Sequence, residues 1–248
     1  MFKESLKLAN FKKVYPVSLL STTALLSVIY FLNKGNASDA EQIVSLAGFA
    51  ISALLFLFLY PVQSQVIGNE LTAGFQDEEP EPVVSVMKRW TQYAISSVGV
   101  IVVFLIGYKI LLPLVGAIAG GLFQVSAFGI ELNLLTLFLN LGAIVWMMFG
   151  MAEISTIGVS FRETFSYTVN FVFTNFLKVV QFSVIFMLLS YAVLFMLVQT
   201  VNAGLYLLPV KVLVIAYVIA FLNTYATNLF IDNVSDEDFA EAEEDTEE

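Results

Sequence analysis

The sequence contains no cysteine and no histidine. Without cysteine there is no disulfide, and with neither residue the chain lacks the usual ligands of zinc and of haem iron. Histidine is also the commonest general base near neutral pH, so its absence removes the usual Ser–His and Cys–His catalytic pairs. We therefore expect no metal centre and no cofactor.

Charged residues are also scarce, at 13% of the 248 residues, whereas an ordinary soluble domain has roughly 25%. Hydrophobic residues make up 58% of the chain, the mean hydropathy is +0.85, and 23 residues are phenylalanine. This composition is typical of a membrane protein. The length accommodates one membrane domain without a separate soluble enzyme domain.

Six apolar runs of about 18–22 residues follow one another along the chain. At about 1.5 Å per residue, a helix of that length crosses a hydrocarbon core of roughly 30 Å. We therefore predict an all-α, polytopic transmembrane bundle over residues 1–231. The expected spans are 15–32, 43–62, 93–112, 132–152, 179–198 and 210–231.

The basic residues fall mainly in alternate gaps between these runs. Eight of the 11 lie on one predicted side: Lys3, Lys7, Lys12, Lys13, Lys88, Arg89, Arg162 and Lys178. The other three are Lys34, Lys109 and Lys211. Because short cytoplasmic loops carry the excess of Lys and Arg, this asymmetry predicts that both termini are cytoplasmic. We expect a multi-pass protein of a prokaryotic plasma membrane.

The net charge of −10 comes from the C-terminal tail, 232–248, which contains ten acidic residues and no basic one. This segment has too little apolar material to fold by itself and is predicted to be disordered. It is either a solvated end or an arm that binds a basic cytoplasmic partner. No basic patch suggests binding to nucleic acid.

Short interfacial helices are predicted on the cytoplasmic side. Residues 1–13 form an amphipathic pattern suited to anionic headgroups. Ser160-Phe-Arg-Glu163 matches a capping box, and large apolar residues at helical spacing follow it. The nearly uncharged gap 113–130 is either a re-entrant segment or an extension of the preceding helix to Gly120–Gly121.

Polar residues within the predicted spans are the candidate functional residues. Asn133, Thr136 and Asn140 recur at three- and four-residue steps, so they share one face of a helix. Asn223 and Thr227 form a second group. Each group either lines a polar pathway or joins helices by hydrogen bonds.

Ionisable residues near the ends of the spans form a further set. Lys109 and Glu131 are a candidate ion pair at the outer surface, or each reaches the interface separately. Glu153 follows the fourth span, and we expect its carboxylate to reach headgroups or water. No P-loop, zinc-protease helix or nucleophile elbow is present, and no catalytic residue is predicted.

Two stretches carry a resemblance to a known family. Ser160-Phe-Arg-Glu-Thr-Phe165 and Asn175-Phe-Leu-Lys178 precede two helices that end at Asn228-Leu-Phe-Ile-Asp232. An acidic, proline-containing loop, Asp77–Pro82, precedes the third span. This arrangement resembles prokaryotic six-helix membrane proteins similar to the membrane domain of glycerophosphodiester phosphodiesterases. The resemblance implies a six-helix membrane domain. It transfers neither the activity nor any functional residue, because the chain has no phosphodiesterase domain.

These observations lead to a function hypothesis without catalysis. We expect an accessory or scaffold subunit that contacts lipids and other membrane protein subunits, or further copies of itself. The alternative is a small transporter or pore whose pathway follows the polar face of 132–152. An enzyme of lipid metabolism is disfavoured, since no histidine, cysteine or cluster of acids is present to act.

Overall fold

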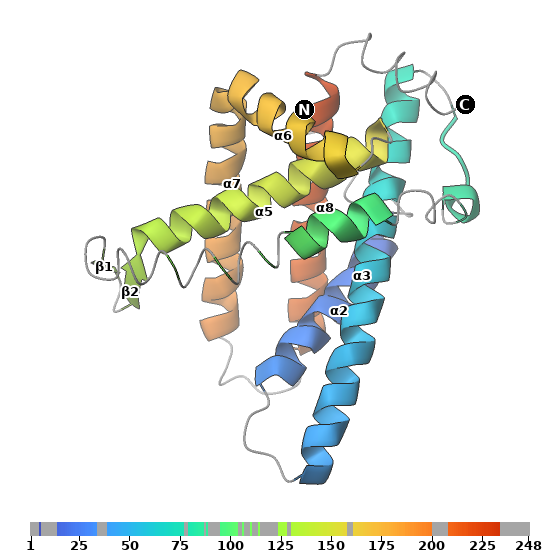
Figure 1. The fold of residues 1–248 in the computed structure, drawn as a ribbon. Helices are drawn as coiled ribbons and strands as arrows, with labels where there is room; N and C mark the ends of the chain where they lie inside the picture. Colours follow the sequence, from blue (N-terminus) through green and yellow to red (C-terminus); the bar gives the residue numbers. More distant parts are fainter. Residues whose placement is uncertain are drawn as a thin grey trace.

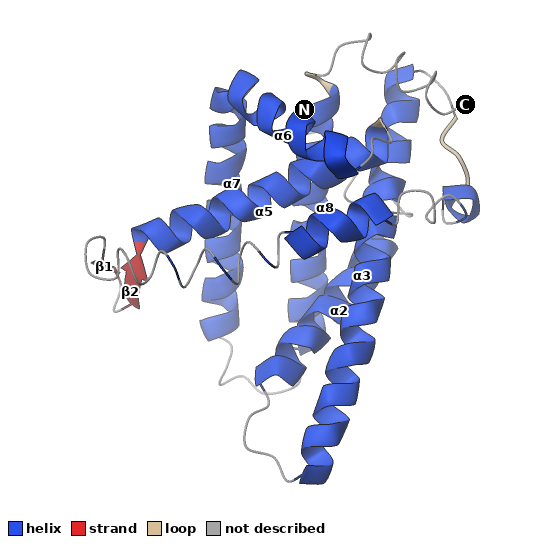
Figure 2. Ribbon diagram, in the orientation of Figure 1, coloured by secondary structure: helices blue, strands red, loops and turns tan. Residues whose placement is uncertain are grey.

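The computed structural model is built of helices and one short β-hairpin (Figures 1 and 2). It describes residues 5, 14–33, 39–76, 79–86, 88, 95–103, 106, 110, 114, 124–127, 130–157, 161–199 and 208–233. The helices are α2 (Val14–Asn33), α3 (Asp39–Gln76), α5 (Leu134–Thr156), α6 (Phe161–Thr174), α7 (Phe176–Gln199) and α8 (Leu208–Ile231). The strands are β1 (Gln124–Ala127) and β2 (Ile130–Asn133), and residues 95–103 are also helical.

Three described helices are long and apolar enough to cross a membrane. Their apolar stretches are Ser45–Gly74 in α3, Phe176–Val193 in α7 and Pro209–Ile231 in α8. Shorter apolar stretches, Val14–Val28 and Leu141–Thr156, lie in α2 and α5. The prediction of a helical protein with membrane-crossing segments is therefore confirmed at this coarser level.

Helix α3 is much longer than the predicted span 43–62. It has 38 residues, which corresponds to roughly 57 Å at about 1.5 Å per residue, well beyond a hydrocarbon core of roughly 30 Å. The prediction ended the helix where polar residues begin, at Gln63. The structure continues it to Gln76 because Gln63, Ser64, Gln65 and Glu70 are buried against neighbouring elements and not exposed in a loop.

The β-hairpin was not predicted. Strands β1 and β2 are antiparallel, with Gln124 opposite Asn133 and Ala127 opposite Ile130. Polar and apolar residues alternate along Ile130–Asn133, which is a strand pattern, and two residues separate the strands in the chain. The predicted helix at 132–152 therefore begins later, at Leu134. Most of the gap 113–130 lies outside the described residues.

Helices α2, α3 and α8 pack against one another, and α5 packs against α3 and α8. Figure 1 shows α5 running obliquely across α7 and α8, while α6 crosses in front of the upper part of α8. The apolar core lies between these helices and includes Val66, Phe149 and Phe182. Phe149 and Phe182 contact each other edge to face, with ring centroids 5.3 Å apart.

Segments from several parts of the chain meet at one end of the molecule. The Asn228 amide donates a hydrogen bond to the Ser5 hydroxyl (3.4 Å), and the Lys178 ammonium donates to Asn233. Asn69, near the end of α3, exchanges hydrogen bonds with the backbone of Glu81. Helix α6 lies at the same end in Figure 1. The beginning and the end of the described chain are therefore neighbours.

Candidate functional site

Six polar side chains on α2, α3 and α8 are buried. We call them the polar site: Ser18, Ser21 and Thr22 on α2, Tyr60 and Gln63 on α3, and Asn223 on α8. Tyr60 and Gln63 are three residues apart, so they project from the same face of α3. All six are buried inside the bundle, away from both solvent and lipid.

Hydrogen bonds in the polar site join all three helices. The Ser21 hydroxyl donates to Gln63 Oε1 at 2.5 Å, which links α2 to α3. The Tyr60 hydroxyl donates to Asn223 Oδ1 at 3.1 Å, which links α3 to α8. The Ser18 hydroxyl donates to the backbone oxygen of Ala216 at 2.8 Å, which links α2 to α8. These bonds connect segments up to 198 residues apart in sequence.

Two amide nitrogens of the polar site have no partner among the described residues. They are Nε2 of Gln63, whose side chain is 0% exposed, and Nδ2 of Asn223. Oγ1 of Thr22 is also buried and has no hydrogen-bond partner among the described residues. An unmade hydrogen bond at a buried group costs about 1–3 kcal/mol, so such groups are rare in native proteins. The polar site can therefore supply N–H donors to a small group that carries acceptor oxygens.

The predicted pair Asn223 and Thr227 is only partly brought into this site. Asn223 takes part through its bond with Tyr60. Thr227 is buried on α8, but its hydroxyl donates to the backbone oxygen of Asn223 at 2.9 Å. This bond lies within one helix and so does not join two helices.

The structure describes only part of the predicted polar face of 132–152. Asn133 ends β2, and Thr136 and Asn140 lie on α5, but their side chains are outside those that the structure describes. Further along the same face, Gly150 is buried. A Cβ placed on it would lie 3.3 Å from Thr164 Cγ2, so this end of the face packs closely on α6.

The predicted outer ion pair stays a prediction. Lys109 lies outside the described residues. Glu131 occupies β2, where its backbone pairs with that of Ser126. Its side chain is not described.

The prediction that Glu153 reaches headgroups or water is wrong. Its side chain is 0% exposed, and its Oε2 accepts a hydrogen bond from the Thr168 hydroxyl at 2.7 Å. The physical reason is that α6 folds back over the C-terminal end of α5 and covers the carboxyl group. Sequence spacing shows where a helix ends, but it does not show which later helix covers that end.

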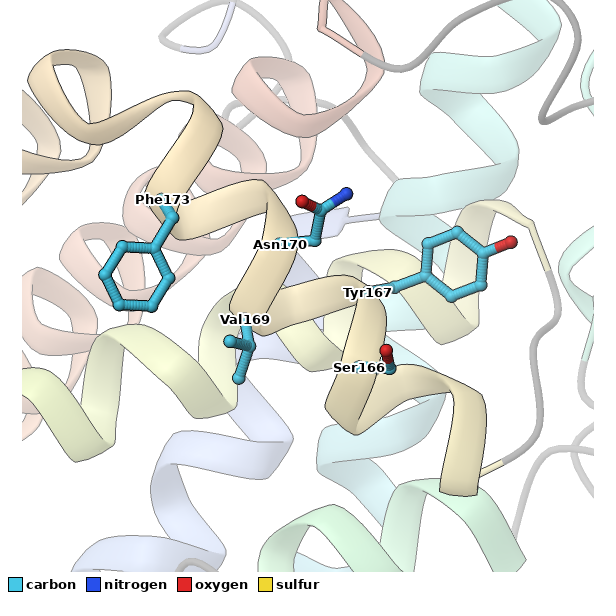
Figure 3. A pocket seen from close by; sticks show the side chains of 5 residues that line it. All are labelled: Ser166, Tyr167, Val169, Asn170 and Phe173. Carbon is cyan, nitrogen blue, oxygen red and sulfur yellow. The ribbon is translucent and has the colours of Figure 1, made fainter.

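A shallow hollow of about 430 Å³ lies on the exposed side of α6. Its lining residues are Ser166, Tyr167, Val169, Asn170 and Phe173. All five come from this single helix, and Figure 3 shows their side chains pointing apart. Since no second element in the described part of the chain lines it, this hollow does not enclose a ligand as the usual small-molecule site does.

Sequence reasoning missed Ser21, Tyr60 and Gln63. The available signal was the polar run Gln63-Ser64-Gln65 directly after a long apolar segment, with Tyr60 one turn earlier. Within the described ranges, no group of three or more acidic residues is placed to hold a metal ion. No protein-family model, curated protein or solved structure matches the chain, so the family resemblance stays a prediction.

Proposed function

We propose that this protein is a non-catalytic accessory or scaffold subunit of a membrane protein complex. The observation that carries the proposal is the use of polar side chains in the core. Ser18, Ser21 and Tyr60 each donate a hydrogen bond from one helix to another, which is the way polar residues hold membrane helices together. Such groups stabilise a bundle without performing chemistry.

A surface for partner subunits is available on α7. Only 11% of its apolar stretch is buried, compared with 56% for α8, so α7 is a peripheral helix. Six of its exposed apolar side chains recur at three- and four-residue steps, and we call them the α7 stripe: Leu177, Val180, Val184, Leu188, Tyr191 and Phe195. We propose that partner helices, from other subunits or from a second copy, pack on this stripe.

Site-specific cross-linking tests the scaffold proposal. Because the chain has no cysteine, a photo-cross-linker can be attached at Leu188→Cys on the α7 stripe, or at Leu54→Cys on α3 as a control. The two side chains are equally exposed, at 65% and 68%. In native membranes we expect a protein adduct at position 188 and only lipid adducts at position 54. Lipid adducts alone at both positions, with a lone monomer in mild detergent, would contradict the proposal.

We further propose six spans in a prokaryotic plasma membrane, with both termini cytoplasmic. The meeting of Ser5 with Asn228 and of Lys178 with Asn233 supports one common side for both ends of the described chain. In Figure 1, α5 and the helix 95–103 are inclined to α3, α7 and α8. In the six-span arrangement, α5 and the proposed span that contains 95–103 therefore cross with a larger tilt.

A small transporter or pore is the second candidate. The observation that favours it is that Nε2 of Gln63 and Nδ2 of Asn223 are buried and have no hydrogen-bond partner among the described residues, so both could donate to a solute with acceptor oxygens. The protein reconstituted alone into liposomes would then move solute. Gln63→Leu, and Asn140→Leu on the predicted polar face, would each stop the flux. Absence of flux for a panel of small anions and polyols would rule against this candidate.

A further inference from the structure

Glu153 lies in a closed junction between three helices. Its carboxyl group is covered by α6, where Thr164 and Thr168 are both fully buried. A Cβ on Gly150, one turn before Glu153, would lie 3.5 Å from Thr168 Oγ1 and 3.6 Å from Val100 Cγ1. The helix 95–103 therefore approaches α5 from a second side, and little space remains around the carboxyl.

Polar partners for this carboxyl are few. Oε2 accepts the hydrogen bond from Thr168, and Oε1 has no partner within the described part of the chain. Ser97 lies one turn from Val100 on the same face of 95–103. It is also fully buried, and its hydroxyl has no described partner. The polar contact described for the Glu153 carboxyl is therefore one hydroxyl group, that of Thr168.

The described elements that pack on α5 carry few ionisable groups. They are Asp39, Glu41, Tyr60 and Glu70 on α3, Arg162, Glu163 and Tyr167 on α6, Lys178 and Tyr191 on α7, Lys211, Tyr217 and Tyr225 on α8, and Glu131 on β2. Both charged residues of α6, Arg162 and Glu163, are on its exposed side, whereas Thr164 and Thr168 are on its buried side. The hydrogen bond recorded for the carboxyl comes from a neutral hydroxyl.

An ionised carboxylate in this position would be costly. The free-energy penalty for burying a charge exceeds what one hydrogen bond to that charge returns. A neutral carboxylic acid avoids that penalty. It also has an O–H that can donate, and hydroxyl oxygens next to it can accept. The same site cannot balance a divalent cation, because it has one carboxyl group.

We propose that Glu153 is a proton-binding site, in which the carboxyl group is sealed beneath α6 and holds a proton at neutral pH. The ligand is a single proton, which needs no cavity. This inference does not rest on the scaffold proposal or on the transporter alternative, because it concerns only the state of one side chain in the folded protein.

Infrared spectroscopy of the full-length protein in lipid tests this proposal. At pH 7 an ordinary glutamate is protonated in only roughly one molecule in 500, so exposed residues give almost no carboxylic C=O band. We expect the native protein to show such a band for one group. The band should vanish in Glu153→Gln and remain in Glu163→Gln, the matched change on the exposed side of α6. Identical carboxylic C=O spectra for the native protein and Glu153→Gln would overturn the proposal.

A second variant keeps the proposal testable if Glu153→Gln fails to fold. Thr168→Val removes the described hydrogen-bond partner but nearly keeps the volume. We expect the C=O band to move to higher frequency, because the acid loses a hydrogen bond. A band that stays at the native frequency in folded Thr168→Val would assign it to another residue and overturn the proposal. The proposal would also be overturned if Glu153→Gln lost a carboxylate band and kept the carboxylic C=O band.

Discussion

Tyr60 and Asn223 show what a buried polar contact contributes at the scale of single residues. The tyrosine hydroxyl donates to Asn223 Oδ1 across the α3–α8 contact, while Nδ2 of the same amide has no described partner. In membrane proteins such interhelical bonds contribute about 0.6 kcal/mol on average and up to about 1.7 kcal/mol. The Tyr60 contact belongs at the upper end, because its loss would leave the whole amide without a described side-chain partner.

Tyr60→Phe is therefore expected to lower the free energy of unfolding by about 1–2 kcal/mol. The control is Tyr191→Phe, since Tyr191 is 52% exposed on α7 whereas Tyr60 is 5% exposed. Reversible unfolding in mixed micelles measures both variants against the native protein. Equal stabilities for the two variants would show that the hydrogen bond to Asn223 contributes nothing measurable.

Single-residue patterns in the sequence identified Asn223 as an inward-facing polar residue, but they left Gln63 unassigned. Gln63 follows directly after a predicted span, where a polar residue ordinarily marks a helix end. Its burial depends on Ser21, 42 residues earlier, which donates to its Oε1. A local pattern carries no information about a partner at that distance.

At the scale of elements, the close approach of α3 and α5 depends on one glycine. A Cβ placed on Gly68 would lie 2.3 Å from the backbone oxygen of Ser155, which is far closer than atoms can pack. Small residues at helix contacts allow backbones to approach in this way. The Gln65 side chain also donates to the backbone oxygen of Ile154 at 3.4 Å, so this contact combines close packing with a hydrogen bond.

Gly68→Ala should separate α3 from α5 and lower the stability by about 1–3 kcal/mol. Gly74→Ala is the matched control on the same helix, because a Cβ there meets nothing within 4 Å. Alanine favours helix by about 1 kcal/mol over glycine, so this control should be neutral or stabilising. Melting temperatures in one detergent compare the two variants. A Gly68→Ala protein as stable as the native one would contradict the contact.

Helix α6 shows how an element can have two different faces. Thr164, Thr168 and Phe171 are buried, whereas Phe165 and Phe173 are exposed. The helix predicted after Ser160 is present, and its boundary at Phe161 agrees with the capping-box pattern, although Ser160 itself is outside the described residues. Its large exposed aromatic side chains suit an interface with lipid. Its threonines cover Glu153, which the sequence pattern did not indicate.

At the scale of the whole molecule, topology is the property to measure. The six-span proposal places the gap after α2 outside, the gap after α3 inside and the β-hairpin outside. A four-span arrangement, in which 95–112 and α5 remain in the inner interface, also keeps both termini on one side. The two arrangements differ in the location of the hairpin.

Single cysteines at Asn36, Lys88 and Ser126 distinguish these arrangements, because the native chain has no cysteine. In intact cells, a membrane-impermeant maleimide should label Asn36→Cys and Ser126→Cys but not Lys88→Cys if there are six spans. Labelling at position 36 alone would indicate four spans. Labelling of Lys88→Cys would overturn both arrangements, because it places the inner segments outside.

Composition and periodicity were enough to predict a helical protein with segments able to cross a membrane. Long apolar runs leave a chain no stable alternative in lipid, where each backbone polar group must be bonded within its own segment. Composition therefore predicted the membrane-crossing helices without any knowledge of how they pack. The asymmetry of basic residues predicts the orientation in the same way, and that prediction awaits the labelling experiment.

Which polar groups contact one another depends on the fold. Periodicity assigns a residue to a face of its helix, but the neighbour of that face depends on how helices distant in sequence are arranged. Tyr60 and Asn223 are 163 residues apart, and Glu153 meets Thr168 because α6 turns back over α5. The polar site and the buried Glu153 carboxyl both depend on that arrangement of helices. The hydrogen bonds and the burial of such a group come from neighbours on other helices, which its own segment does not contain.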